Sequence, residues 1–241
     1  MEGVGILIRR EEVRDDELIT KYNPKSPAAE AYRSLRTNIS FLSPDQPLKT
    51  IALTSSSPEE GKSLTTANLA ISIAQEGKRV IIIDADLRKP MQHRFFKMTN
   101  HTGLSKILTD KIEFAGGLRE SGVEGVQVVS SGPIPPNPVE LIGSAKMKEV
   151  IKAAEAKADL VLIDTPPVIA VTDTTVLADK VDGFVLVVAS QMTSKEVLIK
   201  ARETLDKVRA NVIGTVLNRD TIYYGNEKYY DYYYYGERVN A

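Results

Sequence analysis

The chain has 241 residues, no cysteine and a formal net charge of −1 at neutral pH. These values exclude disulfide bridges and thiolate metal sites, and they give no reason to expect nucleic acid or an anionic membrane surface as a main partner. Apolar residues make up 42% and charged residues 26% of the sequence, as in ordinary globular proteins. The apolar runs are too short to cross a membrane, and the N-terminus lacks the pattern of a secretory signal. We therefore expect a cytoplasmic protein.

The first 25 residues mix charges without a clear period, so we expect an extended arm. At Ser26 the pattern changes, because a serine can cap a helix and Pro27 suits its first turn. Apolar residues then recur at steps of three and four up to Leu42, which predicts an amphipathic helix. The Ser-Pro step at 43–44 ends this helix.

Beyond this helix, short apolar runs alternate with helical patterns. Strands are expected at 50–55, 79–84, 126–130, 159–163, 183–189 and 212–218. Helices are expected at 62–76, 103–109, 145–157, 173–180 and 194–209. The strands are rich in Val and Ile without alternation, as in a sheet covered on both faces. The sequence therefore predicts an α/β fold with a doubly wound, mainly parallel sheet flanked by helices, and a proline-rich extended loop at 132–138.

A phosphate-binding loop is predicted between the first of these strands and its helix. Against the pattern G-x-x-x-x-G-K-[ST], the chain has Ser56 at the first glycine and then Gly61, Lys62 and Ser63. Backbone N–H groups at the start of a helix stabilise phosphate charge, a lysine reaches the β- and γ-phosphates, and the hydroxyl binds Mg²⁺. The nucleotide-binding residues predicted here are Ser57, Glu59, Glu60, Gly61, Lys62, Ser63 and Leu64.

Carboxylates follow two further strands. Asp84 and Asp86 come at the end of one buried strand, and Asp164 ends another. Ligands bind at the carboxyl ends of the strands in such sheets, so these acids should meet the phosphate loop there. One or two carboxylates, with water, suit Mg²⁺. The residues thus predict a magnesium-dependent nucleoside triphosphatase or kinase, without choosing the phosphoryl acceptor.

Several motifs together resemble the bacterial tyrosine kinases. They are the phosphate loop SSSPEEGKS, the segment IIIDADLR, the strand end LIDTPP, the loop SGPIPPNP, the helix motif EAYRSLRTN and a C-terminal tyrosine cluster. The resemblance extends from about Glu30 to the end of the chain. One position departs from it: Glu59 stands where the family usually has glycine, which should alter the local shape of the loop.

The resemblance implies an ATP- and Mg²⁺-dependent transferase that phosphorylates protein tyrosines. Lys62 would bind and stabilise the transferring phosphate. Ser63 and Asp84 would hold Mg²⁺, with Asp164 as a further metal residue. Asp86 would contact the tyrosine hydroxyl, so the catalytic residues implied are Lys62, Asp84, Asp86 and Asp164.

The resemblance also implies that Asn218 and Arg219 contact the adenine. It further implies a ring-shaped assembly, in which Glu30, Arg33 and Arg36 would contact a neighbouring subunit. One subunit would then phosphorylate the tail of the next. The tail tyrosines are Tyr223, Tyr224, Tyr229, Tyr230, Tyr232, Tyr233, Tyr234 and Tyr235. The implied divisions are an N-terminal arm (1–25), a P-loop kinase domain (26–220) and a tyrosine-rich tail (221–241).

The family's split, Gram-positive type implies a separate transmembrane adaptor that activates the kinase. The adaptor would recruit it to the inner face of the membrane, where it would regulate the synthesis and export of capsular or extracellular polysaccharide. Two alternatives remain at this point: a partition or septum-positioning ATPase, and a nucleotide-binding scaffold of the polysaccharide machinery. The first would carry an additional lysine early in its phosphate loop, where this chain reads SPEEGKS. The basic, aromatic stretch 89–97 is either a docking surface or a core segment that contributes Phe95 and Phe96.

Overall fold

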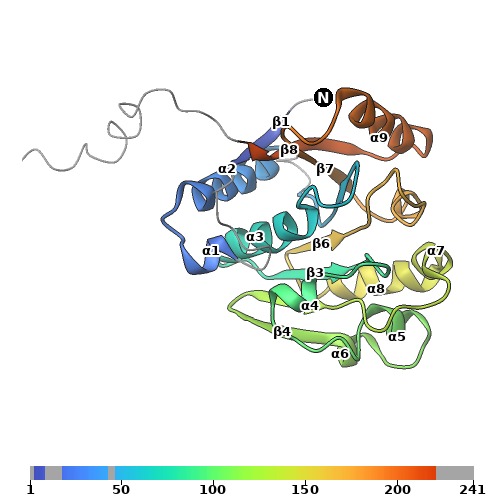
Figure 1. Cartoon of the computed structure of the whole chain (residues 1–241). Helices are drawn as coiled ribbons and strands as arrows, with labels where there is room; N and C mark the ends of the chain where they lie inside the picture. The colour runs from blue at the N-terminus through green and yellow to red at the C-terminus, as the bar shows by residue number, and fades with distance from the viewer. Residues whose placement is uncertain (1–2, 9–17, 43–46, 221–241) are drawn as a thin grey trace, which may run out of the picture.

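A central sheet of eight strands organises the computed structural model, which describes residues 3–8, 18–42 and 47–220 (Figure 1). The strand order is β1-β8-β7-β2-β6-β3-β5-β4, and all neighbours are parallel except β4 and β5. The strands are β1 (Gly3–Ile8), β2 (Thr50–Ser55), β3 (Val80–Asp84), β4 (Leu118–Val123), β5 (Val126–Val129), β6 (Leu160–Asp164), β7 (Gly183–Ala189) and β8 (Val212–Asp220). The predicted mainly parallel α/β fold is confirmed.

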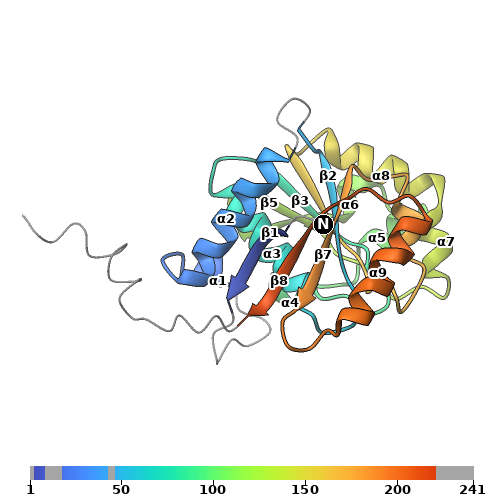
Figure 2. The same ribbon diagram turned by 90° about the horizontal axis from the view of Figure 1, so that it is seen from above.

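Helices cover both faces of this sheet, as Figure 2 shows from above. They are α1 (Ile19–Tyr22), α2 (Pro27–Phe41), α3 (Lys62–Ala74), α4 (Gln92–Phe95), α5 (Leu104–Leu108), α6 (Phe114–Gly117), α7 (Pro138–Gly143), α8 (Ala145–Glu155) and α9 (Lys195–Lys207), with one 3₁₀ turn, η1 (Thr175–Leu177). In the described part of the chain, no helix has the length and apolar character that a membrane span requires.

Two apolar clusters, one on each face, form the core. Ile82 of β3 packs in the cluster that includes α2 and α3, whereas its neighbours Ile81 and Ile83 pack with α5 and α8 on the other face. Successive side chains of a strand point to opposite faces, so a strand buried on both sides is apolar throughout. Phe95 and Phe96 belong to the first cluster and are buried. This agrees with the prediction that the stretch 89–97 contributes these two residues to the core.

The predicted helix after Ser26 is confirmed. Ser26 caps α2 by accepting a hydrogen bond from the backbone N–H of Ala29 at 3.2 Å, and Pro27 occupies the first turn. The helix predicted at 173–180 is wrong, because only Thr175–Leu177 form a 3₁₀ turn. The β-branched residues there disfavour a helix, and the Thr174 hydroxyl instead donates to the carbonyl oxygen of Pro166 at 2.7 Å.

Part of the N-terminal arm belongs to the folded domain. Its strand β1 pairs in parallel with β8, and Leu18, just before α1, is buried. Thr20 donates to Asn68 Oδ1 from both its backbone nitrogen, at 3.0 Å, and its hydroxyl, at 2.8 Å. These contacts hold α1 against α3. The tyrosine-rich tail, 221–241, lies outside the described residues.

Candidate nucleotide-binding and phosphoryl-transfer site

The predicted site residues meet at the carboxyl ends of three adjacent strands, β2, β6 and β3. Asp84 and Asp164 are direct partners in the register of β3 and β6, so the two carboxylates start from neighbouring positions. The phosphate loop, 56–63, leaves the end of β2 beside them. Parallel pairing alone therefore brings together acids that are 80 positions apart in the chain.

The phosphate loop has two residues with positive φ, Glu59 at 66° and Gly61 at 88°. Gly61 is the residue before α3, so its conformation turns the backbone into the helix N-terminus. Glu59 adopts the left-handed region, which glycine reaches without steric cost, so the glutamate is strained there.

The buried carboxylate of Glu60 braces the loop from inside. Its Oε2 accepts a hydrogen bond from the Ser57 backbone N–H at 2.8 Å, and its Oε1 accepts one from the Thr193 hydroxyl. The Asn218 side chain, at the end of β8, donates to the Glu60 carbonyl oxygen at 2.9 Å. The loop is thus tied to two segments distant in sequence, which fixes its backbone N–H groups before any ligand binds.

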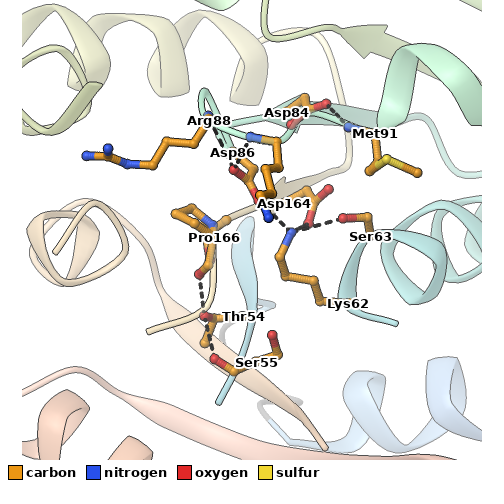
Figure 3. A network of polar contacts seen from close by, with 12 residues as sticks. Thr54, Ser55, Lys62, Ser63, Asp84, Asp86, Arg88, Met91, Asp164 and Pro166 are labelled. Carbon is orange, nitrogen blue, oxygen red and sulfur yellow. Dashed lines mark hydrogen bonds and ion pairs between the residues drawn. The ribbon is translucent and has the colours of Figure 1, made fainter. Parts of the chain in front are cut away.

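Lys62 projects into the centre of the carboxylates (Figure 3). Its Nζ lies 3.0 Å from Asp86 Oδ2, 3.3 Å from Asp164 Oδ1 and 3.0 Å from Ser63 Oγ. Burial opposes the charge of this amine, but the combined attraction of Asp164, Asp86 and Asp84 outweighs it and raises the pKa of Lys62. Lys62 is therefore a protonated cation that can pair with phosphate oxygens.

Asp84 uses only one of its two oxygens. Oδ2 accepts from the backbone N–H groups of Met91 at 3.1 Å and Gln92 at 3.0 Å, while the buried Oδ1 has no hydrogen-bond partner among the described residues. Burial, followed by repulsion from Asp164, raises the pKa of Asp84 well above its usual range. An added cation would relieve both effects, because it stabilises the charged form.

Asp164 is held on both sides. Its Oδ1 faces Lys62, and its Oδ2 accepts from Gln92 Nε2 at 2.8 Å. Burial raises the pKa of Asp164, and the charge of Lys62 opposes that rise. The backbone beyond Asp164 is also fixed, since the Thr54 hydroxyl donates to the Pro166 carbonyl oxygen at 2.9 Å (Figure 3).

These donors fit Mg²⁺. The unpartnered Asp84 Oδ1 and the Ser63 hydroxyl are hard oxygen donors, and Gln92 contacts both of these residues. Within residues 3–8, 18–42 and 47–220, no group of three or more His, Cys, Asp or Glu residues is arranged to hold a metal. Mg²⁺ does not need such a cage, because it retains several waters and takes oxygens from bound phosphates.

Asp86 lies beside Lys62 rather than beside Asp84 Oδ1. Its Oδ1 accepts from the backbone N–H groups of Arg88 at 3.3 Å and Lys89 at 2.9 Å, and its Oδ2 accepts from Lys62. The two aspartates of this segment therefore face different partners. Asp86 lies slightly nearer than Asp164 to the amine that would bind the transferring phosphate, at 3.0 Å against 3.3 Å.

The remaining predicted residues lie on α3, β8 and α2. Leu64 is half-buried in the first turn of α3, and Arg219 at the end of β8 has Nη1 3.2 Å from Met192 Sδ. On α2, Arg33 pairs with Glu30 and donates to the Pro24 carbonyl oxygen at 2.8 Å.

Arg36 differs from the other two residues expected at a subunit contact. It donates to the Ser72 carbonyl oxygen at 2.6 Å and pairs with Glu76 at 2.9 Å, so it holds α2 against α3 within its own chain.

Sequence reasoning missed three contributors to the site, namely Gln92, Thr193 and the ion pair between Arg88 and Asp173. The motif D-x-D-x-R contains Arg88, but nothing in the local pattern identifies its partner. Gln92 and Thr193 reach the site only because α4 and the loop before α9 fold over it, and no periodic signal marks them.

A strand, a glycine-lysine-serine loop, a helix and acidic strand ends define a P-loop nucleotide-binding protein. The family model that matches residues 48–239 is ParA, described as NUBPL iron-transfer P-loop NTPase. The tyrosine-protein kinase YwqD of Bacillus subtilis is 43% identical over 223 residues, which are 92% of each chain. The putative tyrosine-protein kinase CapB of Staphylococcus aureus is 40% identical over 89% of this chain and 92% of its own. The chain therefore belongs to the bacterial tyrosine kinases.

Solved structures agree with this assignment. The chimerical protein CapA2B2 has a TM-score of 0.85 at 36% identity, with 91% of this chain and 94% of that chain covered. The kinase domain of the Escherichia coli tyrosine kinase ETK has the same TM-score, 0.85, at 30% identity, covering 90% of this chain and 89% of that one. The septum site-determining protein MinD from Pyrococcus horikoshii, at 23% identity and a TM-score of 0.61, is similar in fold alone. The relatives that match most of the chain at 30% identity or more are named tyrosine kinases, and the likeness to the septum-positioning protein is one of fold.

Proposed function

We propose that this tyrosine kinase uses Mg-ATP to phosphorylate the tyrosines of its C-terminal tail, each subunit acting on a neighbouring copy. The observation that carries the proposal is the position of Lys62, a buried cation between Asp86 and Asp164, together with a buried oxygen of Asp84 that has no partner among the described residues. This arrangement supplies a phosphate-binding cation, oxygen donors for a metal and a separate carboxylate at one place. The eight tyrosines between Tyr223 and Tyr235 supply acceptors in the same chain.

Each residue has a distinct role in this proposal. The backbone N–H groups of the loop that ends at Gly61 receive the phosphates, and Lys62 pairs with the transferring group. Ser63 and Asp84 would hold Mg²⁺, with Asp164 as a further metal residue, and the bound ion would neutralise phosphate charge. Asp86 accepts a hydrogen bond from the incoming tyrosine hydroxyl and receives its proton as the new P–O bond forms, while the bond between the γ-phosphorus and the β–γ bridging oxygen breaks and ADP leaves.

The proposal extends to the adenine of ATP and to the contact between subunits. Asn218 and Arg219 lie at the end of β8, where the phosphate loop is tied to the sheet, and we propose that they contact the adenine. Glu30 and Arg33 are available on α2 for a ring contact, to which Arg36 contributes by fixing the helix.

A separate transmembrane adaptor activates the kinase in this scheme and recruits it to the inner face of the membrane. We propose a role in capsular or extracellular polysaccharide production. One relative, from Klebsiella pneumoniae, is named as a putative tyrosine-protein kinase in the cps region and is 35% identical over 214 residues. The chain covers 29% of that relative's length.

The experiment is incubation of the full chain with Mg-ATP, followed by mapping of phosphotyrosine in residues 221–241. Lys62→Met should abolish labelling, because it removes the cation proposed to pair with the transferring phosphate. Lys78→Met, which changes an exposed lysine at the end opposite the site, is the matched control and should label normally. Failure of the wild type to label, with the cytoplasmic segment of an adaptor supplied, would contradict the kinase function and leave a nucleotide-binding scaffold.

Transfer between subunits has its own test. A chain with Lys62→Met and an intact tail is mixed with an active chain whose eight tail tyrosines are changed to phenylalanine. Labelling of the first chain shows transfer between molecules, whereas no labelling shows that each site modifies only its own tail.

Phosphorylation should also loosen the ring. Each phosphate adds about −1.5 to −2 charges at neutral pH, so several on one tail repel one another and the site's carboxylates. Light scattering before and after labelling measures this, and an unchanged mass would contradict it.

A further inference from the structure

Gln92 is a buried polar residue that contacts all three residues proposed to organise the metal. It is the first residue of α4, and its exposed fraction is 0%. Its backbone N–H donates to Asp84 Oδ2 at 3.0 Å. Its side-chain Nε2 donates to Asp164 Oδ2 at 2.8 Å and to the Ser63 carbonyl oxygen at 3.0 Å.

The orientation of this amide follows from its partners. A carboxylate oxygen and a carbonyl oxygen both accept hydrogen bonds, so only the NH₂ group, with two hydrogens, satisfies both. The opposite orientation would place three oxygens against one another. Gln92 Oε1 is consequently left as a buried acceptor without a partner among the described residues, in the same region as the unpartnered Asp84 Oδ1.

A role in core packing alone does not account for these contacts. An apolar side chain of similar volume would fill the same space, and burying an amide is unfavourable unless it is hydrogen-bonded. Both hydrogens of the Gln92 amide are directed at groups of the site, one on β6 and one on the first turn of α3. The amide therefore fixes the distance between these two elements at the point where phosphate and metal would bind.

We propose that Gln92 is a positioning residue of the metal and phosphate site. By holding Asp164 Oδ2, its amide fixes the carboxylate so that Oδ1 faces Lys62. By holding the Ser63 carbonyl oxygen, it fixes the turn that carries the Ser63 hydroxyl. The inference rests on the proposed Mg-ATP function of this site. Partners that orient metal-binding groups typically contribute a factor of about 10–100 in affinity or activity when they are removed.

The test measures binding of a fluorescent N-methylanthraniloyl-ATP to the full chain, with Mg²⁺ and with EDTA. Gln92→Met keeps the side-chain volume and the backbone contact to Asp84 but removes both amide hydrogen bonds. We expect its affinity with Mg²⁺ to fall by about 10–100-fold, and its affinity in EDTA to stay within about twofold of the wild type. The Mg²⁺ concentration that gives half-maximal kinase activity should rise by a similar factor, with a smaller change in kcat.

Gln75→Met is the matched control. Gln75 Nε2 also donates to a backbone carbonyl, that of Thr20 at 2.9 Å, but it lies at the far end of α3. This variant should bind as the wild type does in both conditions. If Gln92→Met does not fold, Gln92→Asn decides the question, because its shorter amide cannot span both partners.

Three results would overturn the inference. In the first, Gln92→Met keeps the full Mg²⁺ dependence of the wild type. In the second, it loses affinity equally with Mg²⁺ and with EDTA, which indicates a general structural role. In the third, wild-type binding is itself insensitive to Mg²⁺. Only this third result would also overturn the proposed function, so the two failures are distinguishable.

Discussion

Asn218 fills the space beside Gly61: a Cβ atom built on Gly61 would lie 2.0 Å from Asn218 Nδ2. The same nitrogen donates to the Glu60 carbonyl oxygen at 2.9 Å. The phosphate loop and the end of β8 are therefore so close that any side chain at residue 61 would have to displace Asn218. This contact links the phosphate loop to β8, the strand proposed to contact the adenine.

Gly61→Ala should weaken nucleotide binding by tenfold or more. The new methyl group displaces Asn218 from Glu60, and alanine at a positive φ is strained by about 1–2 kcal/mol. Nucleotide titration and urea unfolding measure the two effects. Gly77→Ala separates them, because Gly77 also has a positive φ, 81°, but a Cβ there meets nothing within 4 Å. The control should lose stability and keep its nucleotide affinity. Equal binding by the Gly61 variant would contradict the close approach.

Arg88→Met should lower the free energy of unfolding by about 1–3 kcal/mol, since it leaves a buried carboxylate without its cation. The Arg88 guanidinium lies 3.1 Å from Asp173 Oδ1 and 3.2 Å from Oδ2, and the Asp173 side chain is only 1% exposed. A double-mutant cycle with Asp173→Asn measures the coupling by urea unfolding. Additive effects of the two changes would show that the pair contributes nothing to stability.

The arginines of α2 should behave differently from each other. Arg36→Ala removes contacts to Ser72 and Glu76 on a side chain that is 15% exposed, and should destabilise the monomer by about 1–3 kcal/mol. Arg33→Ala removes an exposed pair and should change stability by no more than about 0.5 kcal/mol. If α2 is a ring contact, Arg33→Ala should nevertheless lower the oligomer mass measured by light scattering. An unchanged mass would count against the ring contact.

The link between Asp159 and Arg79 predicts a pH dependence of stability. Hydrogen bonds from the Arg79 side chain and backbone lower the pKa of Asp159 from 3.8 to about 2. A carboxyl whose pKa is lower in the folded state contributes stability above its unfolded pKa and loses that contribution as the pH falls. The stability difference between the wild type and Asp159→Asn should therefore be constant above about pH 5 and shrink between pH 4 and pH 2.

Urea unfolding at a series of pH values measures this difference. It should be small, because both side chains are largely exposed. Glu203→Gln is the control, since the Glu203 side chain, on α9, has no hydrogen bond or ion pair with the other described residues. A constant difference between wild type and Asp159→Asn from pH 6 to pH 2 would contradict the assignment.

Much of the fold follows from local pattern. The apolar runs of β2, β3, β6 and β7 are recognisable without neighbours, because strands buried on both faces are apolar throughout. Strand β4 was missed because its sequence, LRESGV, is mostly polar and its position depends on pairing with β5. The prediction of a helix at 173–180 was wrong because the local pattern favours a helix, whereas in the fold the Thr174 hydroxyl donates to the Pro166 carbonyl oxygen.

The sequence by itself determined the chemistry of the protein: a Gly-Lys-Ser loop between strand and helix, acids at two strand ends, and tyrosines at the chain's end. These features are readable because each needs particular residue types within a short, continuous segment. Only the tertiary structure decided that Gln92 supports Asp164, that Glu60 is braced by Thr193, and that Arg36 turns toward α3. Such pairs lie tens to more than a hundred residues apart, and their contact depends on how helices and loops close over the sheet. No local propensity encodes that closure.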